Sequence, residues 1–383
     1  MIAVRDTRGR LVRAQSAAAQ RGLDAVLISP GSDLRWLTGH HPPPLERLTC
    51  LVVPSSGRAS LVVPALEGPA AQACDAVREG GVHLATWRET DDPFQLVGAL
   101  LEGALGRQPA QVAVSDRMWA AHIEGLRAAL GGADWLTAGA LLADLRVVKD
   151  AAEVQALREA AAAIDRVHAG MGEWLRPGRT EREVGADVGR AITDEGHERV
   201  NFVIVGSGPN GASPHASVTD RVLRPGDPVV VDIGGTMPSG YCSDCTRTYV
   251  VPAYADAPQQ AEVDEAFCRM YEVLRRAQQA GLDAVRPGVR AESVDHAARS
   301  VIDAAGYGSY FIHRTGHGIG LDEHEEPWIV AGDETLLAPG MAFSVEPGIY
   351  LPGRFGARIE DIVVVTDSGV EVLDTADRSL LVP

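Results

Sequence analysis

Acidic side chains interrupt apolar, strand-like runs in the second half of this chain, and this feature restricts its fold more than any other. Asp232 directly follows Val229-Val230-Val231, and Glu360 lies within Ala357-Arg358-Ile359-Glu360-Asp361-Ile362-Val363. A carboxylate inside a buried strand is costly unless an ion pair or a bound cation compensates its charge. The fold must therefore bring these acids together with positive groups or with metal ions.

Two further acids and a histidine occur in the same half. Asp244 lies in Tyr241-Cys242-Ser243-Asp244-Cys245, Glu346 follows Phe343-Ser344-Val345, and His317 lies between two glycines. Four carboxylates and one imidazole suit two divalent cations about 3.5 Å apart, with carboxylates bridging them. Two cations that share a water lower its pKa towards neutrality. Each acid taken alone could instead be a turn or ion-pair residue, but the full set predicts metal-assisted hydrolysis.

Composition excludes several classes of protein. Hydrophobic residues make up 45% of the 383 residues, which argues against extensive disorder. The formal net charge of -17 would repel nucleic-acid phosphates. No apolar run reaches the ~18 residues of a membrane helix, and the first residues lack the apolar core of a signal peptide. Five cysteines suit a reducing compartment. We therefore expect a cytoplasmic protein without nucleic-acid or membrane partners.

The pattern along the chain predicts two domains, 1–147 and 148–383. In the first, residues 22–29 form a short apolar run, and residues 51–53 and 61–63 form a hairpin pattern across a Pro-Ser-Ser-Gly turn, which is typical of an α/β domain. In the second, helices are expected over 151–175, 180–195, 257–281 and 291–305. They alternate with strand-rich segments in the antiparallel manner of an α+β domain.

Five ordered motifs in the second domain carry a family resemblance: GPNGASPHA, VVVDIGG with YCSDCTRTYVV, HRTGHGIGLDEHEEP, FSVEPGIYLPG and ARIEDIVVV. Together they resemble the pita-bread metallopeptidases, in the branch of Xaa-Pro dipeptidases (prolidases) and aminopeptidase P. The earlier segments GLDAVLISPGSDLRWLTGH and LRVVKDAAEVQALREAA resemble the creatinase-type N-terminal domain. The resemblance implies a pita-bread catalytic domain preceded by a smaller creatinase-type α/β domain.

The resemblance also implies a metal-binding role for each of the five polar residues. Asp232 would bind one ion, Asp244 and Glu360 would bridge both, and His317 and Glu346 would complete the second site. The family uses manganese, cobalt or zinc, and an oxygen-rich ligand set favours manganese.

Four residues match the family's catalytic positions. Glu346 would also accept the proton of the attacking water, and His324 and His215 would contact the substrate carbonyl and stabilise the tetrahedral intermediate. Arg358 would orient carboxylates beside the last ligand, although a purely structural ion pair with Glu360 is an alternative.

The implied reaction is hydrolysis of Xaa-Pro bonds in short peptides with proline at the second position, by a homodimer. Chain length favours a dipeptidase, and aminopeptidase P, which shares the motifs, is the alternative. A metal-free creatinase-like amidinohydrolase and an inactive binding module are further alternatives, but relatives of those kinds lack the complete ligand set.

Three other patterns have weaker interpretations. The segment 206–211 fits G-x-G-x-x-G, but prolines before Asp232 argue against the helix that a dinucleotide site needs. Cys242 and Cys245 would point to opposite faces of an extended strand. The i, i+4 pair His313 and His317 has glycines around it that disfavour a helix. In addition, Asp232 and Asp244 are 12 positions apart (244 − 232), one more than expected, and the extra residue falls in the turn 235–240.

Overall fold

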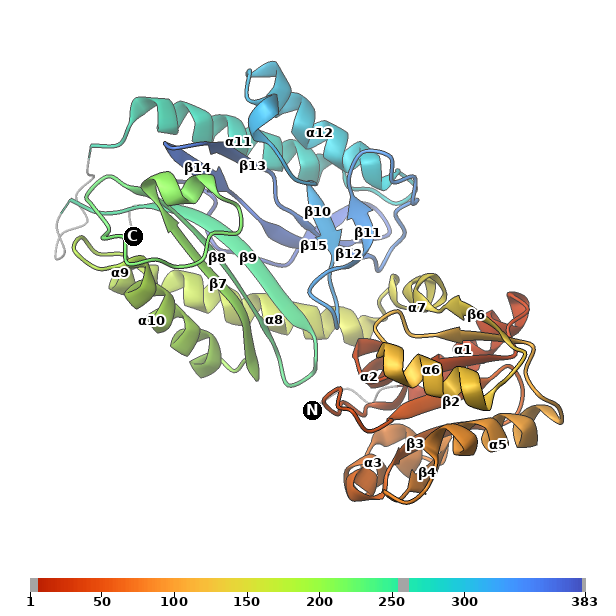
Figure 1. Ribbon diagram of the computed structural model, residues 1–383. Helices are drawn as coiled ribbons and strands as arrows, with labels where there is room; N and C mark the ends of the chain where they lie inside the picture. The colour runs from red at the N-terminus through yellow and green to blue at the C-terminus, as the bar shows by residue number, and fades with distance from the viewer. Residues whose placement is uncertain (1–5, 254–261, 381–383) are drawn as a thin grey trace. The chain divides into compact units, whose positions relative to one another are not determined.

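The computed structural model describes residues 6–253 and 262–380. The chain divides into two compact units, Met1–Arg146 and Val147–Pro383. Each unit has its own sheets and its own core, and Figure 1 shows them in colours that run from red to blue along the chain. No helix in the described residues is both long and apolar enough to cross a membrane.

The first unit is a mixed six-stranded sheet in the order β4-β3-β2-β1-β5-β6. Its strands are β1 (Ala25–Ile28), β2 (Cys50–Pro54), β3 (Ala59–Pro64), β4 (Val82–Trp87), β5 (Gln111–Val114) and β6 (Asp134–Thr137). The α-helices are α1 (Thr7–Gln20), α2 (Ser32–Thr38), α3 (Gly68–Gln72), α4 (Asp75–Arg78), α5 (Pro93–Leu105), α6 (Ala120–Ala129) and α7 (Gly139–Arg146), and the 3₁₀ turn η1 is Ala65–Glu67. The predicted hairpin is confirmed, because β2 and β3 pair antiparallel with Leu51 opposite Leu61.

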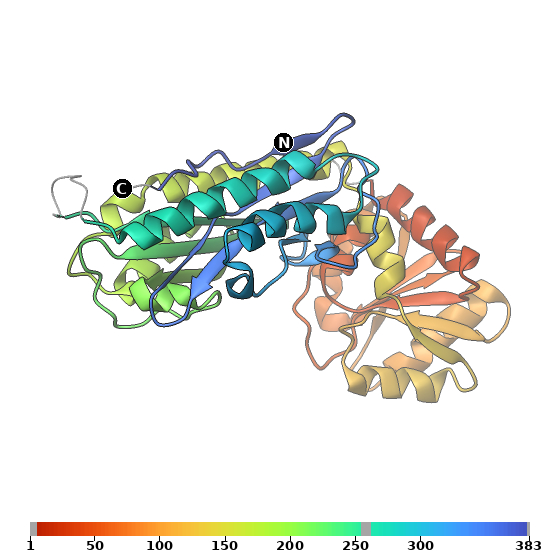
Figure 2. The ribbon, with the colours of Figure 1, turned by 90° about the horizontal axis from the view of Figure 1, so that it is seen from above.

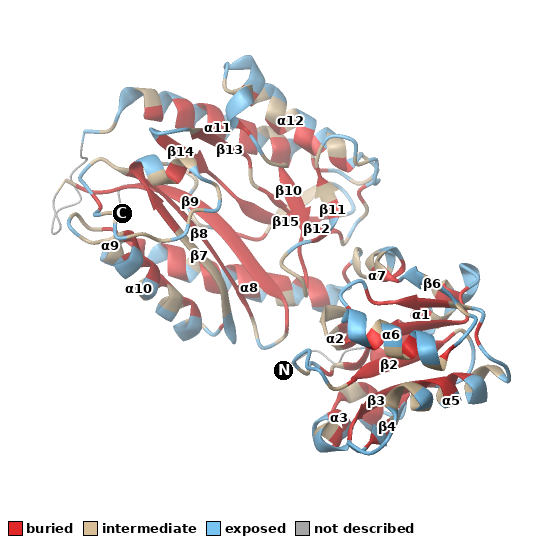
Figure 3. Cartoon of the chain, viewed as in Figure 1, coloured by how far each residue is buried: buried red, intermediate tan, exposed pale blue. Residues whose placement is uncertain are grey.

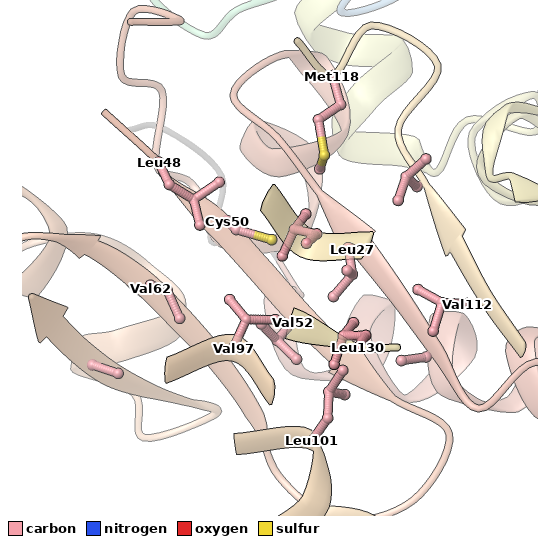
Figure 4. Close-up of a cluster of buried hydrophobic side chains, with 14 of the residues drawn as sticks. Leu27, Leu48, Cys50, Val52, Val62, Val97, Leu101, Val112, Met118 and Leu130 are labelled. Atoms are coloured by element: carbon pink, nitrogen blue, oxygen red, sulfur yellow. The ribbon is translucent and has the colours of Figure 1, made fainter. Parts of the chain in front are cut away.

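Apolar side chains on one face of the central strands form a core with helices α5 and α6. Leu27 of β1, Val52 of β2 and Val112 of β5 are buried against Leu101 of α5, as Figure 4 shows. The strands β1, β2 and β3 are buried along their whole length, which explains why they read as continuous apolar runs rather than as alternating patterns.

The described residues of the second unit form three separate sheets. The first is antiparallel in the order β7-β8-β9, the second has the order β11-β10-β12-β15-β16, and the third is the pair β13-β14. Their strands are β7 (Arg199–Ser207), β8 (Pro228–Thr236), β9 (Cys242–Val250), β10 (Gly316–Gly318), β11 (Glu325–Ile329), β12 (Ala342–Val345), β13 (Gly348–Leu351), β14 (Phe355–Arg358), β15 (Asp361–Val365) and β16 (Val370–Val372).

Helices cover these sheets from two sides. They are α8 (Ala151–Ala169), α9 (Met171–Trp174), α10 (Glu181–Asp194), α11 (Glu265–Ala284) and α12 (Ala291–Ala304), with 3₁₀ turns η2 (Gly208–Ala212) and η3 (Gly308–Tyr310). Helices α8 and α10 pack against β7–β9, and α11 and α12 lie side by side over the other strands in Figures 1 and 2.

The helix predictions hold with two differences. The predicted helix 151–175 is divided at Gly170 into α8 and α9, and α8 begins at a capping box formed by Asp150 and Glu153. The predicted helix 257–281 begins only at Glu265, after its N-cap Asp264. Residues 257–261 of that prediction lie outside the described residues.

Alternation along β8 explains how a charged residue can lie in a buried strand. Val229, Val231 and Ile233 belong to the apolar cluster that packs against α8 and α10. Residues between them, including Asp232, face the opposite side because successive side chains of a strand alternate. Figure 3 shows β8 and β9 buried throughout, so the acids on this second face lie inside the protein.

Candidate metal centre

The hairpin of β8 and β9 brings Asp232 and Asp244 to one face. Asp232 lies opposite Thr246 and Asp244 lies opposite Gly234, so the two acids are diagonal neighbours across the strand pair. Strand β8 ends at Thr236 and β9 begins at Cys242, and residues 237–241 form the loop between them. The longer spacing therefore leaves both carboxylates on the same face.

The other three predicted ligands come from the five-stranded sheet and its edge. His317 is the middle residue of β10, Glu346 directly follows β12, and Glu360 lies between β14 and β15. The backbone N–H of Glu360 donates to the carbonyl oxygen of Thr246 at 3.1 Å, which joins this region to β9. His317 Nε2 lies 3.3 Å from Glu346 Oε1 and 3.7 Å from Asp244 Oδ2.

Ligand atoms gather in two overlapping groups. Asp232, Asp244 and Glu360 each offer an oxygen within 4.8 Å of the others, and His317, Glu346 and Glu360 form a second such group. Glu360 belongs to both groups, and Asp244 also groups with His317 and His324. All five residues that the sequence singled out as ligands thus converge, in the overlapping arrangement that two neighbouring cations would need.

Hydrogen bonds fix the orientation of His317. Its Nδ1 lies 3.1 Å from the carbonyl oxygen of Gly318, which can only accept, so Nδ1 carries the proton. Its Nε2 then presents a lone pair to the carboxylates and to any cation between them. The backbone N–H of His317 donates to Ser344 Oγ at 3.0 Å, and Ser344 Oγ donates to Glu346 Oε1 at 3.2 Å.

Unpartnered oxygens provide a test of whether this site fits metal ions. Asp232 Oδ1 and Glu360 Oε1 are buried without a hydrogen-bond partner in the described part of the chain. The second oxygen of each is held, Asp232 Oδ2 by Arg358 and Glu360 Oε2 by the Thr246 hydroxyl at 2.7 Å. In such a carboxylate one oxygen is held by a hydrogen bond and the other is buried without a partner. The second oxygen is therefore oriented to bind a cation. The donor set fits two divalent ions.

Burial and crowding act on the carboxylates in the same direction. Desolvation, and then the neighbouring acids, raises the pKa of Asp244 and of Glu360 well above the usual range. Like charges in a dry site disfavour joint ionisation, and a bound cation reverses this effect.

Arg358 lies next to the carboxylates and contacts several groups. Besides its ion pair with Asp232, its Nε donates to Thr246 Oγ1 at 3.0 Å, and a terminal nitrogen donates to the Tyr350 hydroxyl at 2.8 Å. Arg358 does not form the ion pair with Glu360 that was the alternative. The Thr246 hydroxyl lies between them, since it accepts from Arg358 Nε and donates to Glu360 Oε2. Arg358 therefore contacts Asp232 directly and Glu360 through the Thr246 hydroxyl.

A cavity of about 540 Å³ opens onto these residues. Its walls are Phe202, Ile204, His215, Asp232, Asp244, His313, Arg314, His317, Glu323, His324, Glu346, Arg358 and Glu360. It thus contains every residue that the sequence assigned to catalysis or metal binding. The rings of His317 and His324 lie 4.0 Å apart between centroids. Burial and the neighbouring His317 lower the pKa of His324 to about 4, which keeps this imidazole neutral at pH 7.

Sequence reasoning missed part of the cavity wall. Arg314 and Glu323 line the cavity and lie within the motif HRTGHGIGLDEHEEP, so the motif itself held the signal. Tyr350, within FSVEPGIYLPG, does not line the cavity but contacts the wall residues Arg358 and His313. Phe202 and Ile204 alternate along β7 on the face of Asp232. His313 bonds to the Tyr350 hydroxyl at 2.9 Å through Nε2, a connection that spacing alone does not reveal.

The weaker patterns resolve as expected. Cys242 and Cys245 both lie in β9 but belong to different apolar clusters, Cys242 with Tyr241 and Ile319 and Cys245 with Val231 and Tyr249, in agreement with opposite faces. His317 lies in a strand, so it forms no helical pair with His313. The glycine-rich segment forms η2, and no α-helix lies between it and β8, which excludes a dinucleotide-binding unit there.

Comparison with known proteins identifies relatives over nearly the whole chain. The family model for metallopeptidase family M24 matches residues 155–367, and the one for the creatinase/prolidase N-terminal domain matches residues 10–148. The chain is 52% identical over 373 residues to a probable dipeptidase PepE of Mycobacterium tuberculosis, covering 97% of this chain and 96% of the relative. It is 34% identical over 360 residues to a Xaa-Pro dipeptidase of Lactobacillus helveticus, covering 93% and 94%.

Solved structures agree with these relatives. Dipeptidase PepE from Mycobacterium ulcerans superposes with a TM-score of 0.90 at 51% identity, covering 98% of this chain and 97% of that one. A prolidase from Thermococcus sibiricus superposes with a TM-score of 0.87 at 34% identity, covering 98% of each chain. The expected architecture, a creatinase-type domain followed by a pita-bread domain, is thereby confirmed.

Proposed function

Because this chain belongs to metallopeptidase family M24, we propose that it is a two-metal dipeptidase that hydrolyses Xaa-Pro dipeptides. The observation that carries the proposal is the convergence of unpartnered carboxylate oxygens and the Nε2 of His317 on one cavity. The relatives named dipeptidase and Xaa-Pro dipeptidase support the reaction and the preference for proline. We further propose residues 1–147 as the N-terminal domain and residues 148–383 as the catalytic domain.

Two groups of side chains would hold the ions. Asp232, Asp244 and Glu360 would hold one, and His317 and Glu346, with Asp244 and Glu360 as bridges, would hold the other. The oxygen-rich donor set favours manganese, with cobalt or zinc as alternatives. When bound, the ions supply an acidified water at neutral pH and a positive charge near the scissile carbonyl.

Glu346 is positioned to accept the proton of the attacking water. Burial raises the pKa of Glu346, but His317, His313 and Arg358 outweigh this and lower it to about 2. The side chain is therefore a carboxylate at neutral pH. The Ser344 hydroxyl and His317 both contact Oε1, so the carboxylate is held at the edge of the ligand cluster.

His324 and His215 would stabilise the negative charge that develops on the carbonyl oxygen. Both line the cavity, and the neutral imidazole of His324 can donate a hydrogen bond from its protonated ring nitrogen. Donors aimed at a developing oxyanion in a water-poor site contribute strongly to catalysis. Arg358 keeps Asp232 and Thr246 in place for this geometry.

Arg314 supports a dipeptidase over aminopeptidase P. Its guanidinium lies in the cavity wall, 4.4 Å from the ring centroid of Trp328, and no carboxylate forms an ion pair with it among the described residues. A dipeptide ends in a carboxylate directly after proline, whereas a longer peptide continues there as an amide. A guanidinium binds a carboxylate through charge-assisted hydrogen bonds. We propose that Arg314 binds the carboxylate terminus of the dipeptide.

The experiment compares Met-Pro with Met-Pro-Ala, using the full chain with added manganese and with chelator. The proposal predicts metal-dependent release of proline from Met-Pro and slow cleavage of the tripeptide. Cleavage that chelator leaves unchanged would contradict the two-metal site. Faster cleavage of the tripeptide would favour aminopeptidase P instead.

A further inference from the structure

Glu323 is an unpaired carboxylate in the wall of the same cavity. It belongs to the loop between β10 and β11, and its side chain is half-buried. The loop is held in place, because the N–H of Cys242 donates to the Gly320 carbonyl at 2.8 Å. Within the described residues, Glu323 has no hydrogen bond and no ion pair. A partly desolvated charge in this situation is stabilised by a cation from outside the chain.

No neighbouring positive group of the chain forms an ion pair with the Glu323 carboxylate in the described residues. Burial raises the pKa of Glu323; Arg199 and, more weakly, His317 lower it, and Asp322 raises it further. The guanidinium of Arg199 is engaged elsewhere, with Asn201 Oδ1 at 3.0 Å and Thr236 Oγ1 at 3.1 Å. The chain thus holds Glu323 near its reaction centre without neutralising it.

The rest of this wall suits a long aliphatic stem. Arg199 begins β7, and the same strand carries Phe202 and Ile204, whose side chains line the cavity. The Phe202 ring lies close over Gly234, where an added Cβ would come within 2.6 Å of it. Lysine and arginine side chains combine an apolar stem with a cationic head, and they place the stem on apolar surface.

We propose that Glu323 selects the first residue of the substrate and favours a cationic side chain, lysine or arginine. This inference rests on the proposed dipeptidase function. The stem of that residue would pack against Phe202 and Ile204, and its head would meet the Glu323 carboxylate. Glu323 is then a specificity residue, since it takes no part in bond cleavage.

The test compares Lys-Pro with norleucyl-proline, which has a stem of the same length and no charge. Wild-type kcat/KM should be about 10- to 100-fold higher for Lys-Pro, the range expected of a charge-assisted hydrogen bond. In E323Q the Lys-Pro value should fall to that of norleucyl-proline, whose own value should stay within about twofold. The variant E326Q, which removes an exposed carboxylate three positions away, should keep the wild-type preference.

Three outcomes would overturn the inference. The first is a wild-type enzyme that cleaves the two dipeptides equally well. The second is an E323Q variant that retains the preference for Lys-Pro. The third is an equal loss on both dipeptides in E323Q, which would assign Glu323 to the α-ammonium group common to both. Cleavage of norleucyl-proline by the wild type reports the proposed dipeptidase function separately, so failure of that function is distinguishable from failure of this inference.

Discussion

Arg358 forms an ion pair with Asp232 across 126 positions of the chain. The pair occupies Oδ2 of Asp232 and leaves Oδ1 buried without a partner. The same guanidinium donates to Thr246, whose hydroxyl holds Glu360 at 2.7 Å. The Arg358 guanidinium thus contacts Asp232 directly and Glu360 through Thr246, and both carboxylates belong to one group of candidate metal ligands.

Replacing Arg358 with Gln should weaken metal binding and lower activity. Loss of this support usually costs about 10- to 100-fold in metal affinity, because the ligands lose their fixed orientation. Manganese titration by calorimetry and kcat/KM on Met-Pro measure the two effects. The variant R354Q removes an arginine that pairs with Asp264 on the surface, and it should behave as wild type. Equal metal affinity in R358Q and R354Q would contradict the positioning role.

Replacing Asp244 with Asn should change the melting temperature in opposite directions, relative to wild type, with and without metal. In chelator, the variant should melt a few degrees higher than wild type, because one of several crowded, buried carboxylates no longer repels the others. Added manganese should raise the melting temperature of wild type and not that of D244N. Differential scanning calorimetry measures both. The exposed-site variant D283N should follow wild type in each condition, and a metal-dependent rise in D244N would show that Asp244 is no ligand.

Replacing Arg314 with Gln should raise KM for Met-Pro by about tenfold or more and leave kcat nearly unchanged, since the carboxylate terminus loses its charged partner. Hydrolysis of the amide Met-Pro-NH₂ should be unaffected, because that substrate has no terminal charge. The surface variant R276Q provides the control. A similar loss of activity on Met-Pro and on Met-Pro-NH₂ would mean that Arg314 stabilises the fold and does not bind the substrate carboxylate.

Replacing His168 with Gln should make stability less sensitive to acid. Burial, followed by the charge of Arg247, lowers the pKa of His168 to about 3 from the ordinary 6.5. Its Nε2 donates to the Cys245 carbonyl, and its Nδ1 accepts from Tyr249. Below pH 6.5 the unfolded chain binds a proton that the folded chain refuses, so the free energy of unfolding falls as pH decreases from 6.5 towards 3.

Urea unfolding in chelator at pH 7.5 and pH 5 measures this effect. The wild type should lose about 2 kcal/mol more than H168Q between these pH values. The variant H296Q, which removes an exposed imidazole of α12, should keep the wild-type dependence. Parallel pH dependence in wild type and H168Q would show that His168 does not stay neutral in the fold.

Local patterns predicted much of the fold and the ligand set. The apolar positions Val154, Leu157 and Ile164 are buried on α8 as their spacing indicated, and Asp232 lies on a buried strand as its apolar neighbours indicated. The division of the predicted helix at Gly170 was not foreseen, because apolar spacing continues to Met171 and only the backbone hydrogen bonds change.

The charged walls of the cavity were harder to predict. Arg314 and Glu323 are two charged residues in a motif quoted for its histidines, and only the fold shows that both line the cavity and that neither forms an ion pair within the described residues. Tyr350 was also not predicted. Its hydroxyl contacts both Arg358 and His313, and His313 lies in a segment distant in sequence, so only the fold reveals this connection.

Anomalous diffraction from crystals grown with manganese tests the central claim most directly. Two peaks about 3.5 Å apart are expected in each chain, one near Asp232, Asp244 and Glu360 and the other near His317, Glu346 and Glu360. An anomalous map with no peak among these residues, or with a single peak at saturating manganese, would contradict that claim.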